Sequence, residues 1–208
     1  MARKTKTDAE STRQNLLDAA EILFFEKGVS GTTLEEIATA AGVTRGALYW
    51  HFANKGDLFV AMHARVALPL DEMADAILEQ DNPLIALRDY WARAIEYLCE
   101  CEHTRRVVDI LLRKCEYIQE IDQIATCTNA WVTQSVALME QAFDKAKRQG
   151  LIPEEVDPHC AALSLCSMVT GLTYLWLSMP TFIDMKKQSP QMLNQFFGAL
   201  CLRQDTAA

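Results

Sequence analysis

The sequence lacks the residue groupings that enzymes and metalloproteins use. It has no Cys-x-x-Cys pair, no His-Glu-x-x-His, no Gly-x-Ser-x-Gly and no Walker loop. Its seven cysteines are odd in number, which argues against a secreted disulfide framework or a zinc ribbon. His103 and His159 stand alone in loop-like contexts. We therefore expect no catalytic residue, no metal and no cofactor, and we expect the cysteines to be buried apolar residues in a reducing compartment.

Long apolar runs and strand-like alternation are missing as well. No uninterrupted apolar run reaches about 18 residues, so we expect no membrane span and no membrane partner. The opening residues Met1–Lys6 are polar and lack an apolar signal region, which predicts a cytoplasmic protein. Since no segment alternates with a period of two between turn signals, strands are not expected.

The chain is acidic, with a formal net charge of −8 from 20 basic and 28 acidic residues. Such a balance is unusual for a nucleic-acid binder, because phosphate attracts a basic domain. Residues 1–60 hold seven basic and eight acidic residues, which leaves 13 basic and 20 acidic residues for the remainder. Several N-terminal acids stand at expected helix starts, where they face the helix dipole. The charge therefore permits DNA binding by the first 60 residues without supporting it.

Apolar residues recur at helical spacing over nearly the whole chain, which predicts an all-α fold of about nine helices. Gly28, Gly42 and Gly150 are expected to end three of them. Pro69 should bend or stop the helix that follows Asn54, because proline removes an internal hydrogen bond. The last two helices are expected over 158–178 and over about 190–202.

Two short helices joined by one tight turn are predicted between Thr33 and Phe52. Thr33 and Glu36 form a capping box that starts the first helix. Gly42 ends that helix, and Thr44 caps the second. Two helices at a steep angle around a glycine turn are typical of a helix-turn-helix, whose second helix enters the DNA major groove.

The residue types on and around the second helix suit DNA. Hydroxyls, lysine and the N–H groups at helix starts bind phosphate oxygens, and an arginine can reach guanine. We expect DNA contacts from Thr33, Thr44, Arg45, Gly46, Ala47, Tyr49, Trp50, His51 and Lys55. Gly46 should let the backbone approach DNA closely. Trp50 keeps a second interpretation, because its large ring is also typical of a core, as are Leu48 and Phe52. Arg3, Lys4 and Lys6 form either a DNA-tracking arm or a frayed tail.

The stretch Thr44-Arg-Gly-Ala-Leu-Tyr-Trp-His-Phe52, with Asn54-Lys55 and Asp57-Leu-Phe59 after it, resembles the tetracycline-repressor (TetR) family of transcriptional regulators. Met1–Lys6 and Lys114-Cys-Glu-Tyr117 are similar to AcrR-type repressors of multidrug efflux pumps. The resemblance implies a DNA-binding domain over 1–55 and a ligand-binding and dimerisation domain over 56–208. It also implies a homodimer on double-stranded operator DNA that controls an efflux operon and is released by an apolar or amphiphilic small molecule.

In that family the last two helices of each subunit form a four-helix dimer interface. These helices are apolar on more than one face in this sequence, and a second apolar face is a mark of an interface. The expected interface residues are Leu165, Met168, Leu172, Leu175, Phe196 and Phe197.

Aromatic and methionine side chains of the later helices suit an adaptable cavity, although plain core packing is the competing interpretation for each of them. The expected ligand-binding residues are His63, Val66, Leu112, Trp131, Ser135, Met139, Cys166, Thr170 and Tyr174. A buried acid, with Asp109 and Glu116 as candidates, could also pair with a cationic drug.

Two rival functions remain open at this point. One is a DNA-binding regulator without an effector, or one gated by oxidation of a cysteine. The other is a helical ligand-binding or scaffold protein that has lost DNA binding, against which the intact Arg45, Gly46, Tyr49 and Lys55 set argues.

Overall fold

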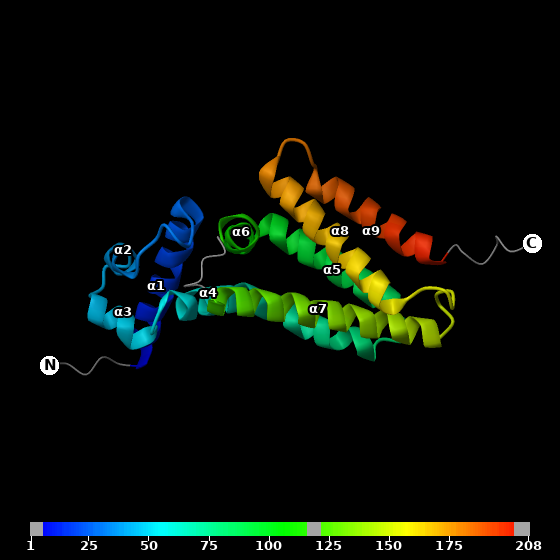
Figure 1. The fold of residues 1–208 in the computed structure, drawn as a ribbon, viewed down its shortest axis with the longest axis horizontal. Helices are drawn as coiled ribbons and strands as arrows, with labels where there is room; N and C mark the ends of the chain where they lie inside the picture. The colour runs from blue at the N-terminus through cyan, green and yellow to red at the C-terminus, as the bar shows by residue number, and fades with distance from the viewer. Residues whose placement is uncertain (1–5, 116–121, 202–208) are drawn as a thin grey trace, which may run out of the picture. The chain divides into compact units, whose positions relative to one another are not determined.

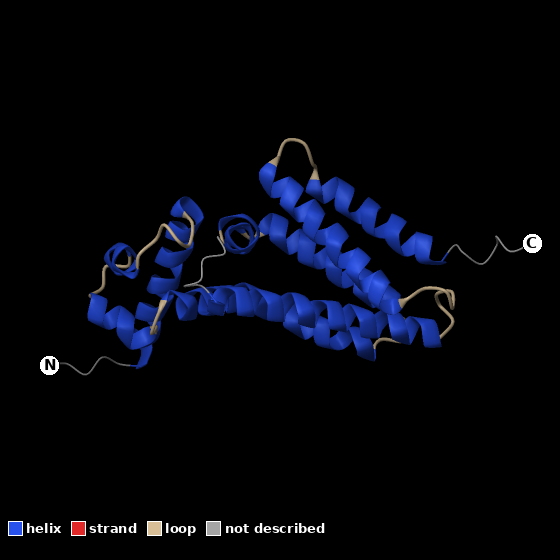
Figure 2. Cartoon of the chain, viewed as in Figure 1, coloured by secondary structure: helices blue, strands red, loops and turns tan. Residues whose placement is uncertain are grey.

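The computed structural model describes residues 6–115 and 122–201 of the 208-residue chain. Every regular element in these two ranges is helical (Figures 1 and 2). The helices are α1 Lys6–Lys27, α2 Leu34–Ala40, α3 Arg45–His51, α4 Lys55–Asp75, the 3-10 turn η1 Ala76–Glu79, α5 Pro83–Glu100, α6 Glu102–Asp109, the π-helical turn η2 Ile110–Lys114, α7 Asp122–Arg148, α8 Pro158–Ser178 and α9 Met185–Cys201. The all-α expectation is confirmed. Arg3, Lys4 and Glu116, which were singled out above, lie outside the described residues.

The chain divides into two compact units. The head unit combines Met1–Ala67 with His103–Asn129, and the body unit combines Leu68–Glu102 with Ala130–Ala208. Both α4 and α7 contribute residues to each unit. The expected domain boundary after residue 55 was drawn along the sequence, and it stays a prediction.

The core of the head unit is built by α1, α2, α3 and the first turns of α4, together with α6 and η2. Phe24 of α1 and Phe59 of α4 are fully buried, with ring centroids 6.4 Å apart. Val107 and Ile110, from α6 and η2, belong to the same buried cluster. Segments that lie some 80 residues from α1 in sequence therefore help to hold the helix-turn-helix together.

The body unit is organised around α5 and α9, which pack against each other. The buried Phe143 of α7 stacks on Phe197 of α9 at 6.2 Å between ring centroids. The end of α7 is also fixed to η1, because the Lys145 ammonium donates to the carbonyls of Leu78 at 2.9 Å and Gln80 at 2.8 Å. These bonds satisfy carbonyls that have no helical partner at the end of a short turn.

Two helix limits differ from the expectation, and both involve proline. Helix α4 does not stop at Pro69 but continues to Asp75, and the alternative, a bend at Pro69, stays a prediction. Helix α9 begins at Met185, five residues before Pro190. The backbone N–H of Asp184 donates to the side-chain oxygen of Gln188 at 3.0 Å, and the Asp184 carboxylate accepts from the Lys187 N–H at 3.2 Å. This local cap starts the helix early enough for the proline to fall inside it.

The expectation that the cysteines are buried is wrong. Among the cysteines whose side chains are described, Cys160 and Cys201 are exposed, and the other four are half-buried. Helix α8 has 21 residues and, by length and composition only, could cross a membrane. Its serines and threonines interrupt the apolar run without adding charge. A single such helix is weak evidence for a membrane span, because core helices pass the same test.

Candidate nucleic-acid interface

The helix-turn-helix forms for the local reasons that its sequence predicts. The Glu36 N–H donates to the Thr33 hydroxyl at 3.2 Å, and the Glu36 carboxylate accepts from the Thr33 N–H at 2.8 Å, so the capping box is complete. The Lys27 ammonium and both Thr33 donors lower the pKa of Glu36 from 4.5 to about 2. Gly42 has a φ of 68°, which favours glycine. The Thr44 hydroxyl then caps α3 by accepting from the Ala47 N–H at 3.2 Å.

The recognition helix α3 turns one side inward and another outward. Leu48 and Phe52 are buried in the head core, as expected. Trp50 is 73% exposed, so the core interpretation of its ring is wrong. Its ring makes an edge contact with the half-buried His51 at 4.5 Å between centroids. A tryptophan this exposed on a short helix is unusual and marks a surface that another molecule covers.

Arg45 and Tyr49 lie together on the exposed side of α3. The Arg45 guanidinium stands 5.5 Å from the Tyr49 ring centroid and donates to the Tyr49 hydroxyl at 3.4 Å. This contact raises the pKa of Arg45, so the side chain keeps its charge. Both side chains are exposed, and stacking holds the guanidinium fork in one orientation. Thr33, Thr44 and Gly46 are exposed too, whereas Ala47 and Lys55 are half-buried.

Lys55 has an internal partner that the sequence did not reveal. Its ammonium donates to the Val29 carbonyl at 2.8 Å, and the Val29 N–H donates to the Lys114 carbonyl at 3.3 Å. The Lys114 ammonium in turn donates to the Phe25 carbonyl and lies 4.6 Å from the Phe25 ring centroid. An ammonium has three donors, so Lys55 can hold Val29 and still bind a phosphate.

A buried acidic side chain ties α1 to α6. Glu21 is only 2% exposed, and its carboxylate accepts from His103 Nδ1 at 2.9 Å. Arg106 Nη1 lies 3.4 Å from the same carboxylate. His103 was expected in a loop, but it lies in α6; His159 likewise lies in α8, with Nδ1 2.9 Å from Glu140. Glu21 lies at helical spacing from Leu17 and Phe24, on the apolar side of α1, and this spacing could have indicated that its carboxylate is buried.

The expected ligand-binding residues fall in both units. Met139 is 1% exposed and His63 is 9% exposed, so both side chains are buried. Val66 packs against the head core, and Leu112, Ser135 and Cys166 are half-buried. Trp131, Thr170 and Tyr174 are exposed. Asp109 is 1% exposed and ion-paired through one oxygen with Arg113, while its other oxygen meets no hydrogen-bond partner among the described residues.

The expected dimer residues also divide by exposure. Leu165, Leu172 and Phe197 are buried within the single chain, at 0%, 7% and 7% exposure. Met168 and Phe196 are half-buried, and Leu175 is 40% exposed. The exposed apolar side chains of α8 are Leu163, Tyr174 and Leu175.

Two cysteine thiols are poorly suited to redox sensing. Burial raises the pKa of Cys115 to about 11, and a hydrogen bond with Asp157 raises the pKa of Cys160. Since the thiolate is the reactive form, both groups are less reactive than an ordinary cysteine. No group of three or more metal-ligating side chains occurs in the described residues.

Comparison with known proteins places the chain in one family. The profile of bacterial regulatory proteins of the tetR family matches residues 16–62. The profile of the C-terminal region of MAATS-type transcriptional repressors matches residues 82–201. The regulator TtgR of Pseudomonas putida is 36% identical over 89% of this chain and 89% of its own.

Two solved structures are similar over nearly the whole chain. NalD, the secondary repressor of the MexAB-OprM multidrug efflux pump in Pseudomonas aeruginosa, is 37% identical with a TM-score of 0.88 over 95% of this chain and 100% of its own. SmeT of Stenotrophomonas maltophilia, in complex with triclosan, is 33% identical with a TM-score of 0.83 over 91% of each chain. These relatives are regulators rather than enzymes. The chain therefore belongs to the tetR family of DNA-binding transcriptional regulators, with a C-terminal region of the MAATS-type repressors.

Proposed function

We propose that this protein is a homodimeric repressor that binds the operator of a multidrug efflux operon in the cytoplasm and leaves it when an apolar or amphiphilic molecule binds. The observation that carries the DNA-binding part is the exposed side of α3, where Arg45, Tyr49 and Trp50 all face away from the head core. An arginine held by an aromatic ring is suited to bidentate contact with guanine, and the Tyr49 hydroxyl to phosphate.

The space around Gly46 also supports DNA binding by α3. A Cβ added at Gly46 would meet only the Thr44 hydroxyl, at 4.0 Å, and no left-handed φ requires glycine there. A glycine in a short helix is less favourable than alanine. Since the folded chain itself gives no reason for glycine at this exposed position, close approach of an outside molecule is the better explanation.

Gly46→Ala is expected to weaken operator binding by about 1 kcal/mol or more, the usual cost of inserting a methyl group into a filled contact. The unfolding temperature should stay unchanged or rise, because alanine favours helix. Arg45→Ala should relax sequence preference at one base pair per half-site, by about 1–3 kcal/mol. Binding at fixed salt to the DNA flanking the gene, and to single-base variants of that DNA, measures both. Parent-like binding by both variants would remove α3 from the interface.

For a ligand to release the protein from DNA, a movement of the ligand-binding residues must be transmitted to the recognition helix α3. The contacts of Glu21 with His103 and Arg106, and of Lys114 with Phe25 and Val29, link α1 to α6 and η2 inside the head unit. Leu112 lies in η2, and π-helical turns are frequent at functional sites. A ligand that displaces this turn would act directly on α1. The unpaired Asp109 oxygen offers such a ligand one polar acceptor.

Triclosan is the natural first probe, because SmeT is known in complex with it. We expect it to raise the operator Kd of this protein by a factor within about 5–150, the usual range of coupling between sites. Operator DNA must then weaken triclosan binding by the same factor. Calorimetric titration of triclosan into the free protein and into its operator complex checks that equality. Tight triclosan binding that is equal in both would favour the effector-free regulator instead.

A further inference from the structure

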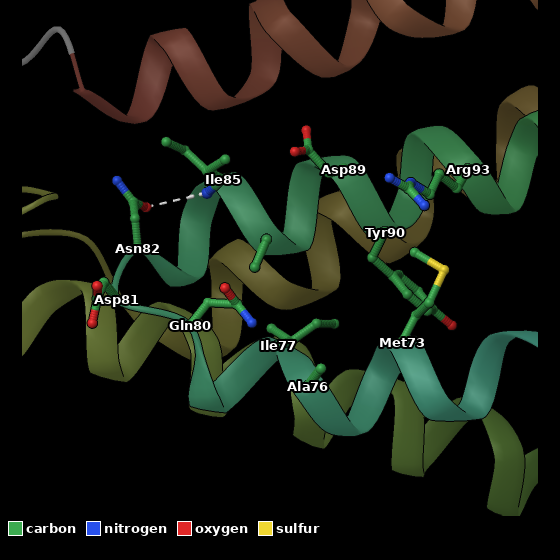
Figure 3. A pocket seen from close by; sticks show the side chains of 11 residues that line it. Met73, Ala76, Ile77, Gln80, Asp81, Asn82, Ile85, Asp89, Tyr90 and Arg93 are labelled. Atoms are coloured by element: carbon green, nitrogen blue, oxygen red, sulfur yellow. Dashed lines mark hydrogen bonds between the residues drawn. The ribbon is translucent and has the colours of Figure 1, made fainter.

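An open groove lies between η1 and the first turns of α5 in the body unit, and none of the nine expected ligand-binding residues lines it. Its volume is about 420 Å³, which is within the range of small-molecule sites. The lining residues, which define the η1–α5 groove, are Met73, Ala76, Ile77, Gln80, Asp81, Asn82, Ile85, Ala86, Asp89, Tyr90 and Arg93. Figure 3 shows Tyr90 of α5 pointing toward Met73 of α4, whereas Ile85 and Asp89 project from another side of α5.

The middle of the groove is apolar. Ile77, which is 1% exposed, forms part of the floor together with Met73 and Ala86. Ile85 stands on the α5 side and is 49% exposed. Ile85 therefore leaves exposed apolar surface at the edge of the groove, which a ligand would remove from water.

The two ends of the groove differ in polarity. Arg93 stands at one end, and Gln80 and Asp81 stand at the other (Figure 3). The side-chain amide of Gln80 extends along the groove toward Ile77. An arginine therefore faces an amide across an apolar centre, and a helix rise of 1.5 Å per residue separates Ile85 from Arg93 by roughly 12 Å along α5.

The charge at the Arg93 end is not neutralised from within the groove. Asp89, one helical turn before Arg93, is the acid that would ordinarily pair with it. Its carboxylate instead accepts from Arg88 Nε at 3.0 Å and from Arg88 Nη2 at 2.9 Å. No described residue forms an ion pair or a hydrogen bond with the Arg93 guanidinium. The remaining acid of the groove, Asp81, lies at the opposite end.

We propose that the η1–α5 groove binds an elongated amphiphile with a carboxylate at one end and a hydrogen-bonding group at the other. The carboxylate binds Arg93 through two parallel N–H donors, the apolar body covers Ile77 and Ile85, and the distal hydroxyl bonds the Gln80 amide. Asp81 at that distal end disfavours a second anionic group and so selects a monoanion. This site goes beyond the repressor function proposed above, because its occupation does not require DNA.

The probe is ω-hydroxydodecanoate, titrated calorimetrically into the DNA-free protein below the concentration at which the probe self-associates. Arg93→Gln is expected to raise its Kd about tenfold or more, because a charge-assisted hydrogen bond is worth about 1.5–3 kcal/mol. Ile85→Glu, which places a repelling charge on an exposed lining residue, should have a similar effect. Arg148→Gln is the matched control: it removes an exposed arginine of the same unit outside the groove, and it should leave the Kd unchanged.

The class of ligand is tested with two analogues. Dodecanoate should bind more weakly because it leaves the Gln80 amide unpaired, and dodecyltrimethylammonium should bind more weakly still because it faces Arg93. No binding of ω-hydroxydodecanoate, equal binding of the cationic analogue, or parent-like binding by both Arg93→Gln and Ile85→Glu would each overturn the proposal. Since the measurement is made without operator, failure of the repressor function leaves its outcome unaffected.

Discussion

Arg106→Ala is expected to destabilise the head unit by about 3 kcal/mol, the low end for removing one partner of a buried ion pair. Glu21 is 2% exposed, and Arg106 with His103 supplies the donors seen at its carboxylate. Without Arg106 the carboxylate is left in the core with one partner that is charged only when protonated. Denaturant unfolding followed by circular dichroism measures the loss.

A double-mutant cycle separates this effect from a simple loss of packing. Glu21→Gln removes the buried charge, so adding Arg106→Ala to Glu21→Gln should cost clearly less than Arg106→Ala alone. If the losses of unfolding free energy for Glu21→Gln and Arg106→Ala were additive in the double mutant, Arg106 would not act by stabilising the Glu21 charge. An Arg106→Ala protein that unfolds at the parent's denaturant midpoint would contradict the role given to this pair.

Leu175→Asp is expected to convert the proposed homodimer to monomers and to weaken operator binding by about a hundredfold or more, because two linked half-sites bind that much more tightly than one. Helix α8 contains no charged side chain except through protonation of His159. Leu163, Tyr174 and Leu175 expose apolar surface on it, by 43%, 48% and 40%. A carboxylate in such a surface would be desolvated without a partner on association.

The choice of residue matters for this experiment. Leu172 is 7% exposed within the single chain, so Leu172→Asp would damage the fold as well as an interface. Leu175→Asp avoids this, and Ile85→Asp gives the same change at a comparably exposed position on α5. Sedimentation should find Leu175→Asp monomeric and Ile85→Asp dimeric. A Leu175→Asp protein that sediments like the parent would place the interface on another surface.

The features that the sequence predicted correctly are local ones. Thr33 with Glu36, Gly42, and Thr44 each act within a few residues, so their caps and turns can be read along the chain. Most helix limits followed for the same reason. The start of α9 was missed because Pro190 is a strong local signal, and the weaker cap at Asp184 lies before it.

The features that the sequence did not predict depend on long-range packing. Glu21 and His103 are 82 residues apart, and the sequence around each residue does not indicate that the two side chains are in contact. The exposure of Trp50 depends on how α1 and α2 cover α3, which the composition of α3 alone does not determine. The η1–α5 groove was not found either, since its polarity depends on Asp89 bonding Arg88 rather than Arg93.

Val29 has a consequence for how the DNA-binding surface can be displaced. Its carbonyl holds the ammonium at the start of α4, and its N–H is held by the carbonyl at the end of η2. Only the φ and ψ of one residue separate these two hydrogen bonds, so neither bond can be displaced far without disturbing the other. Val29 therefore couples the two segments mechanically: a displacement of the end of η2 is transmitted through Val29 to the first turn of α4.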